Sequence, residues 1–154
     1  MHWQLDTIVM SDVNAVDSML FEWQGKWWMF TNMDPAGTGE ICSELFIFSS
    51  ASPLSTSWQA HACNPVLVDA SCARNGGFLR DEGKLFRVSQ RQGFDRYGMG
   101  SQINEIVTLS DDIYEEKCLA RIDPAFGSGL LGTHHLHSAN NVTVYDSLAR
   151  RPSS

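Results

Sequence analysis

Short apolar runs interrupted by turn-forming residues recur along the chain and predict β-strands joined by tight turns. The clearest case is residues 17–32, DSMLFEWQGKWWMFTN, in which two apolar runs flank the pair Gln24-Gly25. Glycine readily adopts the positive φ that the turn of a two-residue hairpin requires. This stretch is therefore predicted to be a β-hairpin, and the rest of the chain is organised around it.

The hairpin pattern returns with a fixed spacing of 58 residues. Gly25 corresponds to Gly83, and Gly83 corresponds in turn to Asn141. Asparagine is the commonest replacement for glycine at a positive φ, so the third position keeps the turn chemistry. One hairpin in each repeat of fixed length is typical of propellers and other repeat arrays.

Four strands are expected in each of two full repeats, and a hairpin alone in the third. Besides the first hairpin, the predicted strands are Trp3–Met10, Glu44–Ser49, Trp58–Ala62, Asn75–Leu79, Lys84–Gln90, Gln102–Leu109, Glu116–Ile122, Thr133–Ser138 and Val142–Ser147. Almost no helix is expected, at most one turn within residues 111–117. The prediction is an all-β chain, a partial β-propeller of about two and a half four-stranded antiparallel blades. It forms one domain over residues 1–148, followed by a flexible tail over residues 149–154.

Two and a half blades cannot close a ring, and each blade hides its faces only against neighbouring blades. Either the chain is a part of a larger propeller, or partner chains complete it. In the second case, Trp3–Met10 of one chain would add to the final hairpin of another, which favours a homodimer with a six-bladed ring.

Composition narrows the classes of partner. With 11 basic and 18 acidic residues the formal net charge is −7, which argues against a nucleic-acid groove and favours neutral or weakly charged ligands. No apolar run approaches the length of a membrane span, and the N-terminus lacks the basic region of a signal peptide. We expect a cytoplasmic protein with no cofactor and no membrane or nucleic-acid partner.

The four cysteines show no CxxC spacing that would indicate a metal site: Cys42, Cys63, Cys72 and Cys118. Free and mostly buried thiols are expected, although spacing alone leaves a disulfide open.

Five stretches resemble a known type of domain when they are taken together. They are VNAVDSMLFEWQGKWWMFTN, SELFIFSSASPLSTSWQAHACNPV, ARNGGFLRDEGKLFRVSQ, RYGMGSQINEIVTLS and GLLGTHH. As a set they resemble the C-terminal half of the five-bladed propellers of glycoside hydrolase family 43 and related furanosidases. They also resemble the N-terminal propeller domain of glucosamine inositolphosphorylceramide transferases. The resemblance covers roughly residues 3–148.

This resemblance implies a funnel for carbohydrate at the propeller axis, lined from the start of the innermost strand of each blade. The matching positions are Asp17, Arg74, Asn75, Thr133 and His134. The family 43 hydrolases use three acids, one from each of three blades. Here only Asp17 is acidic at such a position, so the full catalytic set is not present in this chain.

Asp17 is the candidate catalytic residue, either as a general base or as an acceptor of sugar hydroxyl groups. The alternative is a structural carboxylate at a strand start. Hydrolysis would need a second carboxylate, for which Glu44 and Glu105 are candidates, although solvation of a strand edge explains both.

Ligand binding is further predicted for Arg74, Asn75, Gln90 and Arg96. Arg74 could bind a carboxylate or phosphate group of a ligand, or it could pair with Asp17 between adjacent blades. The run Asn75-Gly76-Gly77 would allow another backbone to approach closely. Arg96 belongs to a loop, residues 91–100, of the kind that often carries binding residues.

Three histidines near the C-terminus raise the question of a metal. On a strand, His135 and His137 would share one face while His134 points to the other. No third ligand follows from the spacing, so no metal site is predicted. His134 is expected to hydrogen-bond to Asp17 or to a ligand.

Trp27, Trp28 and Phe30 are expected in the core or in the packing between blades, with Trp23 the more exposed aromatic residue. Three functions follow from these patterns. The first is a carbohydrate-binding or glycan-associated module that takes a carbohydrate or another small polar ligand. The second is a glycoside hydrolase or glycosyl-transfer enzyme with a composite site from two chains. The third is a structural or assembly domain with its axis filled by Arg–Asp pairs.

Overall fold

The structure is a computed structural model that describes residues 2–93 and 98–150. Arg96, one of the predicted ligand-binding residues, lies outside them. The first sheet contains β1 (Ala15–Trp23), β2 (Lys26–Met33), β3 (Glu44–Ser50), β4 (Gln59–Ala60) and β5 (Leu67–Val68). The second contains β6 (Asn75–Asp81), β7 (Lys84–Arg91), β8 (Gly100–Leu109) and β9 (Tyr114–Ile122). The third unit contains η1 (Pro124–Phe126), β10 (Leu130–Gly132), β11 (Leu136–Ala139), β12 (Val142–Tyr145) and β13 (Leu148–Ala149).

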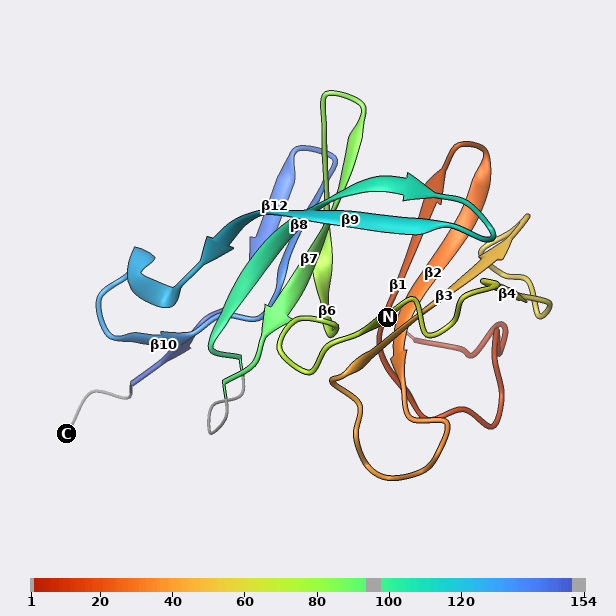
Figure 1. Cartoon of the computed structure of the whole chain (residues 1–154), viewed down its shortest axis with the longest axis horizontal. Coiled ribbons are helices and arrows are strands. Elements are labelled where there is room, and N and C mark those ends of the chain that lie inside the picture. The colour runs from red at the N-terminus through yellow and green to blue at the C-terminus, as the bar shows by residue number, and fades with distance from the viewer. Residues whose placement is uncertain (1, 94–97, 151–154) are drawn as a thin grey trace.

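The sheets are antiparallel and follow the order of the chain. The first runs β1-β2-β3-β4, with β5 also pairing with β3, and the second runs β6-β7-β8-β9. The third unit consists of the pairs β11-β12 and β10-β13. In Figure 1 the hairpins β1–β2, β6–β7 and β11–β12 all point the same way. This is the predicted partial, propeller-like all-β domain, and completion of the ring by a second copy stays a prediction.

The three hairpin turns lie at the predicted repeat positions. Both turn residues have positive φ in each hairpin: 53° and 75° at Gln24 and Gly25, 45° and 76° at Glu82 and Gly83, and 50° and 62° at Asn140 and Asn141. Two successive positive φ angles define the turn that matches the twist of paired strands. The substitution of Asn for Gly in the third repeat therefore conserves the backbone geometry, as predicted.

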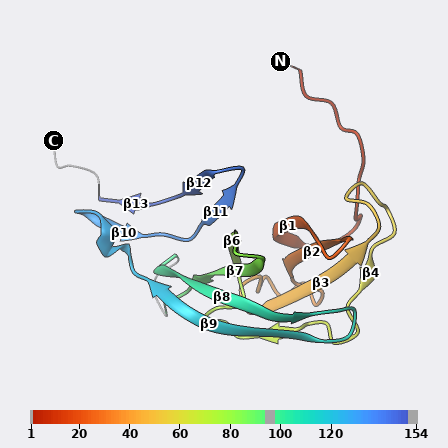
Figure 2. The same ribbon diagram turned by 90° about the horizontal axis from the view of Figure 1, so that it is seen from above.

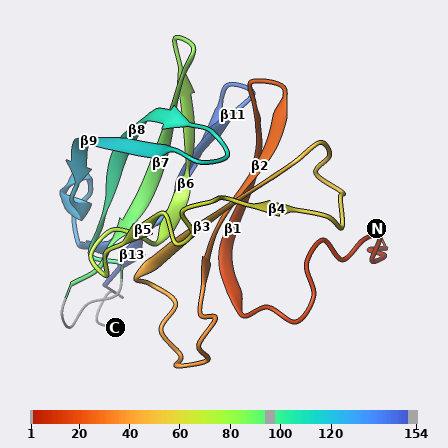
Figure 3. The same cartoon turned by 45° about the vertical axis from the view of Figure 1, so that its right-hand side comes forward.

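The N-terminal segment differs from its prediction. Residues 3–10, expected to form a strand, contain no strand in the structure, and Trp3 is 92% exposed. Figures 2 and 3 show this part of the chain extending away from the sheets. The alternation of apolar residues is compatible with a strand, but a strand needs a neighbour, and none lies beside this segment in the described chain.

Smaller differences occur at sheet edges. The strand expected at residues 58–62 is reduced to the two residues of β4, and β5 and β10 form where no strand was predicted. Residues 133–135 lie outside the final hairpin. Leu148, and Ala149 at the start of the expected tail, pair with β10 as β13. Such short edge strands are set by tertiary contacts, which sequence periodicity does not reveal.

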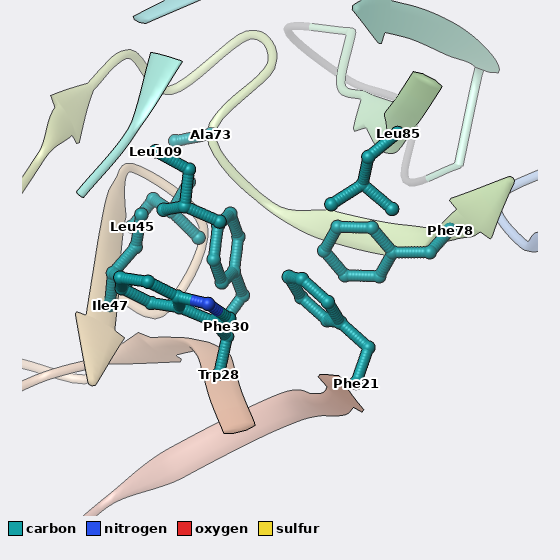
Figure 4. Packing of buried hydrophobic residues seen from close by; sticks show 9 residues of the cluster. All are labelled: Phe21, Trp28, Phe30, Leu45, Ile47, Ala73, Phe78, Leu85 and Leu109. Carbon is teal, nitrogen blue, oxygen red and sulfur yellow. The ribbon is translucent and has the colours of Figure 1, made fainter. Parts of the chain in front are cut away.

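The core lies between the first two sheets, where side chains of β1 and β2 meet those of β6 (Figure 4). The ring of Phe78 lies 4.3 Å from that of Phe21 and 5.3 Å from that of Phe30. Trp28 and Phe30 are buried, as predicted. Aromatic burial of this kind supplies much of the free energy that holds adjacent blades together.

One charged side chain, Arg87 on β7, is completely buried. Its Nε and Nη2 atoms donate to the two carboxylate oxygens of Glu116 at 2.7 and 2.6 Å, and its Nη1 and Nη2 donate to the carbonyls of Ala73 and Cys72. Tyr114 donates its hydroxyl to Glu116 at 2.5 Å. Burial raises the pKa of Tyr114, so its hydroxyl stays protonated as a donor.

The turn between β8 and β9 ties the second sheet to the first. Asp111 accepts a hydrogen bond from Lys26 at 2.6 Å and one from Ser49 at 2.8 Å. These hydrogen bonds, led by that of Lys26, lower the pKa of Asp111. Figure 1 shows the long β8–β9 hairpin reaching across toward β3 and β4.

All four cysteines are free thiols, as expected. The expectation that they are mostly buried is wrong, because Cys63 and Cys118 are exposed and Cys42 and Cys72 are only half-buried. Within residues 2–93 and 98–150, no helix is long and apolar enough to span a bilayer.

Candidate functional site

The inner strands β1 and β6 each begin with a β-bulge, at positions one repeat apart. The register shifts between Val16 and Met19 on β1, and between Asn75 and Gly77 on β6. Asp17, inside the first bulge, has a φ of 51°. A short side chain such as Asp tolerates this conformation, and a bulge redirects the side chain that it carries. Asp17 is thereby turned toward the second sheet.

Four predicted site residues form one hydrogen-bonded group, the Asp17 cluster: Asp17, Arg74, Asn75 and Gln90. Arg74 Nε donates to Asp17 Oδ2 at 2.6 Å, and Gln90 Nε2 donates to the same oxygen at 3.0 Å. Gln90 Nε2 also donates to the carbonyl of Asn75 at 2.7 Å. The alternative raised from the sequence, an Arg74–Asp17 pair between blades, is thus confirmed.

Oδ1 of Asp17 is the acceptor atom that the cluster offers to a ligand. Both hydrogen bonds fall on Oδ2, and within the described chain no donor reaches Oδ1. The Asp17 side chain is 34% exposed, whereas that of Arg74 is 12% exposed. A carboxylate held on one oxygen and open on the other is a preorganised acceptor.

Asn75 is the buried member of the cluster. Its Nδ2 donates to the carbonyl of Asp17 at 3.3 Å, and its backbone N–H donates to Asn32 Oδ1 at 2.8 Å. Asn75 is 1% exposed, yet its Oδ1 has no hydrogen-bond partner among residues 2–93 and 98–150. A buried acceptor without a donor is energetically costly.

The side chain of His134 pairs with Asp146, although its backbone carbonyl lies against Gly76, beside the Asp17 cluster. Its Nδ1 pairs with Asp146 Oδ2, and Asp146 Oδ1 accepts the backbone N–H groups of His134 and His135 at 2.9 and 2.8 Å. The described partner of His134 is therefore Asp146, where the sequence suggested Asp17 or a ligand. A chain of amides leads from the cluster to this region, because Gln92 donates to Gln90 and accepts from the N–H of Gly98.

The other histidines serve packing and hydrogen bonding. The rings of His135 and His137 lie 6.4 Å apart, and His137 Nδ1 accepts the backbone N–H of Phe78 at 3.2 Å. Burial, together with the charge of His135, lowers the pKa of His137, so its neutral form is favoured. In the described ranges no three His, Cys, Asp or Glu side chains gather closely enough to hold a metal ion.

The two candidate second acids have contacts other than Asp17 in the described chain. Glu105 pairs with Lys84 across β7 and β8 at 2.8 Å. It lies in the middle of β8, which pairs with β7 on one side and β9 on the other, so the expectation of a strand-edge position is wrong for it. Glu44 opens β3 and lines a small cavity of about 190 Å³ beside Asp34 and Glu40. Neither is among the partners of Asp17, which are a cation and an amide.

Sequence reasoning missed a cavity of about 350 Å³ beside β1, β6 and β11. Its lining includes Trp27, Arg80 and His137. Trp27 was expected in the core or in the packing between blades; its side chain lies outside the core cluster, is half-buried and lines this cavity. One signal was available: adjacent Trp27 and Trp28 must point to opposite faces of a strand, so one core cannot bury both.

Comparison with known proteins gives one family. The family model described as "Glucosamine inositolphosphorylceramide transferase 1, N-terminal" matches residues 1–124. The chain is 35% identical over 119 residues to glucosamine inositolphosphorylceramide transferase 1 of Arabidopsis thaliana, which covers 74% of this chain and 15% of that protein. The protein of the same name from Oryza sativa subsp. japonica is 34% identical over 119 residues, covering 75% of this chain and 16% of the relative. No solved structure matches the chain.

Proposed function

The chain belongs to the family of the N-terminal domain of glucosamine inositolphosphorylceramide transferases, and we propose that it is a carbohydrate-binding module whose ligand site is the Asp17 cluster. By their names the relatives are glycan-related transferases, and the chain spans only about 15% of their length. Recognition of the sugar is a role that such a segment can perform without the reaction of the whole protein.

The observation that carries the proposal is the half-occupied carboxylate of Asp17. Sugar hydroxyl groups are donors that suit an acceptor already fixed in position, because little conformational entropy remains to be lost on binding. Arg74 and Gln90 supply that fixation. The unpartnered Oδ1 of Asn75 in the same cluster offers a second, buried acceptor.

The replacement Asp17→Asn tests this site. Asn keeps the size of the side chain but removes the charge, so affinity for a bound sugar should fall about tenfold or more. Binding of glucosamine, inositol phosphate and neutral hexoses would be measured by saturation-transfer NMR and calorimetry. The control is Asp81→Asn, an exposed acid at the hairpin end of β6, which should leave binding unchanged.

A structural role is the second candidate, and the Arg74–Asp17 ion pair favours it. In that case the pair joins adjacent blades and no ligand binds. Asp17→Asn would then lower thermal stability while none of the sugars binds the unmodified chain. A sugar that binds and loses affinity in the variant would eliminate this alternative.

A hydrolase or transferase with a composite site remains a prediction that needs a second carboxylate near Asp17. A second copy of the chain is the proposed source. Light scattering decides whether a dimer exists, and only a dimer would justify screening glycoside substrates.

A further inference from the structure

A second cavity lies along the C-terminal halves of β1, β6 and β11, toward the hairpin turns, whereas the Asp17 cluster lies where β1 and β6 begin. We propose that this cavity binds a neutral pyranose ring stacked on Trp27, as a site separate from the Asp17 cluster. The ligand class rests on the proposed carbohydrate-binding function, but the residues that carry it are different. Its volume of about 350 Å³ falls at the lower end of the usual range for small-molecule sites.

Trp27 supplies an accessible aromatic side chain. It lies on β2 directly opposite Glu22 of β1, and the next residue, Trp28, is 4% exposed in the core. Because consecutive side chains of a strand point to opposite faces, Trp27 is turned away from that core. The C–H groups on one face of a pyranose pack favourably against the electron-rich face of an indole.

Arg80 is held in place at the cavity. Its Nη2 donates to the carbonyl of Glu22, and the centre of its guanidinium lies 5.9 Å from the ring of Trp23. In the described part of the chain, its Nε and Nη1 have no hydrogen-bond partner. The guanidinium therefore keeps donors for a ligand while its position is fixed by the protein.

His137 adds a donor whose direction is set by its backbone contact. Its Nδ1 accepts the N–H of Phe78, so the neutral ring must carry its proton on Nε2. His137 lines the same cavity as Arg80 and Trp27. Nε2–H is therefore the donor that this ring can offer to a ligand in the cavity.

The mixture of charges favours a neutral ring over an anion. Glu22 and Asn140 also line the cavity and provide acceptors, whereas a site for phosphate would consist of donors alone. Vicinal hydroxyl groups both donate and accept, which matches a set made of a guanidinium, a carboxylate, an amide and an imidazole N–H. The net charge of −7 further disfavours an anionic ligand.

The test uses the full chain labelled with 5-fluorotryptophan, which gives one fluorine signal for each of the five tryptophans. Methyl glucoside, methyl galactoside, methyl mannoside and N-acetylglucosamine are the probes. At least one is expected to shift the Trp27 signal saturably, with that signal assigned from Trp27→Phe. Measured by calorimetry, because Trp27→Leu has no Trp27 signal, binding should weaken about tenfold in Trp27→Leu. It should not change in Trp3→Leu, which alters a 92% exposed residue.

A second variant keeps the test valid if Trp27→Leu does not fold. Asn140→Gly removes the amide at a φ of 50°, which glycine adopts without strain, and should weaken binding several-fold. Asp17→Asn should leave the Trp27 titration unchanged, which separates this site from the first. The proposal is overturned if no probe shifts the Trp27 signal, or if the affinity measured by calorimetry is undiminished in both Trp27→Leu and Asn140→Gly.

Discussion

Replacement of Glu116 by Gln is expected to lower the free energy of unfolding by about 3–5 kcal/mol, because it leaves the Arg87 guanidinium buried without its counter-charge. Arg87 is 0% exposed and donates both of its shortest hydrogen bonds to this carboxylate. Its other hydrogen bonds, to the carbonyls of Ala73 and Cys72, cannot replace a charge. Urea denaturation followed by tryptophan fluorescence measures the loss.

The acid sensitivity of the protein should change in the same variant. Burial pushes the pKa of Glu116 upward, but the charge and hydrogen bonds of Arg87 outweigh it, so the pKa lies below its ordinary value of 4.5. A depressed folded-state pKa contributes stability that is present above pH 4.5 and is lost as the pH falls through the folded pKa. The difference in stability between the unmodified chain and Glu116→Gln should therefore shrink on acidification below that value.

Two controls define this result. Glu105→Gln breaks the pair with Lys84, whose side chain is 59% exposed, and should cost less than about 1 kcal/mol. The double variant Arg87→Met with Glu116→Leu removes both charges and should recover most of the lost stability. If Glu116→Gln costs no more than Glu105→Gln, Arg87 has access to solvent and the interpretation of a buried pair is wrong.

The parts of the fold that the sequence predicted well are those set by local chemistry. Turn geometry depends on the turn residues themselves, so Gly25, Gly83 and Asn141 could be recognised. The strand expected at residues 3–10 failed because pairing requires a neighbour as well as a suitable pattern. Likewise, β10 and β13 are too short to show periodicity and exist through their contact with each other.

In the candidate site, too, the sequence predicted some features and missed others. The repeat placed Asp17 and Asn75 at equivalent strand starts, and the structure joins them with Arg74 and Gln90. The partner of His134 could not be foreseen, because Asp146 reaches it only after the chain has folded back. The cavity beside Trp27 was also hidden, since it is formed by strands far apart in the sequence.

The second large effect is expected at Gly77, where β6 passes directly against β11. A Cβ atom added there would collide with the backbone carbonyl of Leu136, and the φ of +133° is unfavourable for any side chain. Gly77→Ala should therefore lower the free energy of unfolding by about 2–6 kcal/mol. This sum combines the cost of the steric clash with the cost of the strained backbone. This close approach was anticipated from the run Asn75-Gly76-Gly77, although the segment that it meets was not.

The loss should be local, because β11 and β12 lie outside the aromatic core between the first two sheets. Hydrogen exchange in Gly77→Ala should accelerate across residues 130–149 while β2 and β7 stay protected. The matched control is Gly83→Ala, where φ is +76° but no atom lies within 4 Å, and where only the backbone cost of about 1–2 kcal/mol applies. Equal effects at the two glycines would mean that β11 is not packed on β6 in solution. The cavity beside Trp27 would then lose one wall, so the Trp27 titration provides an independent measure of whether the third unit is in place.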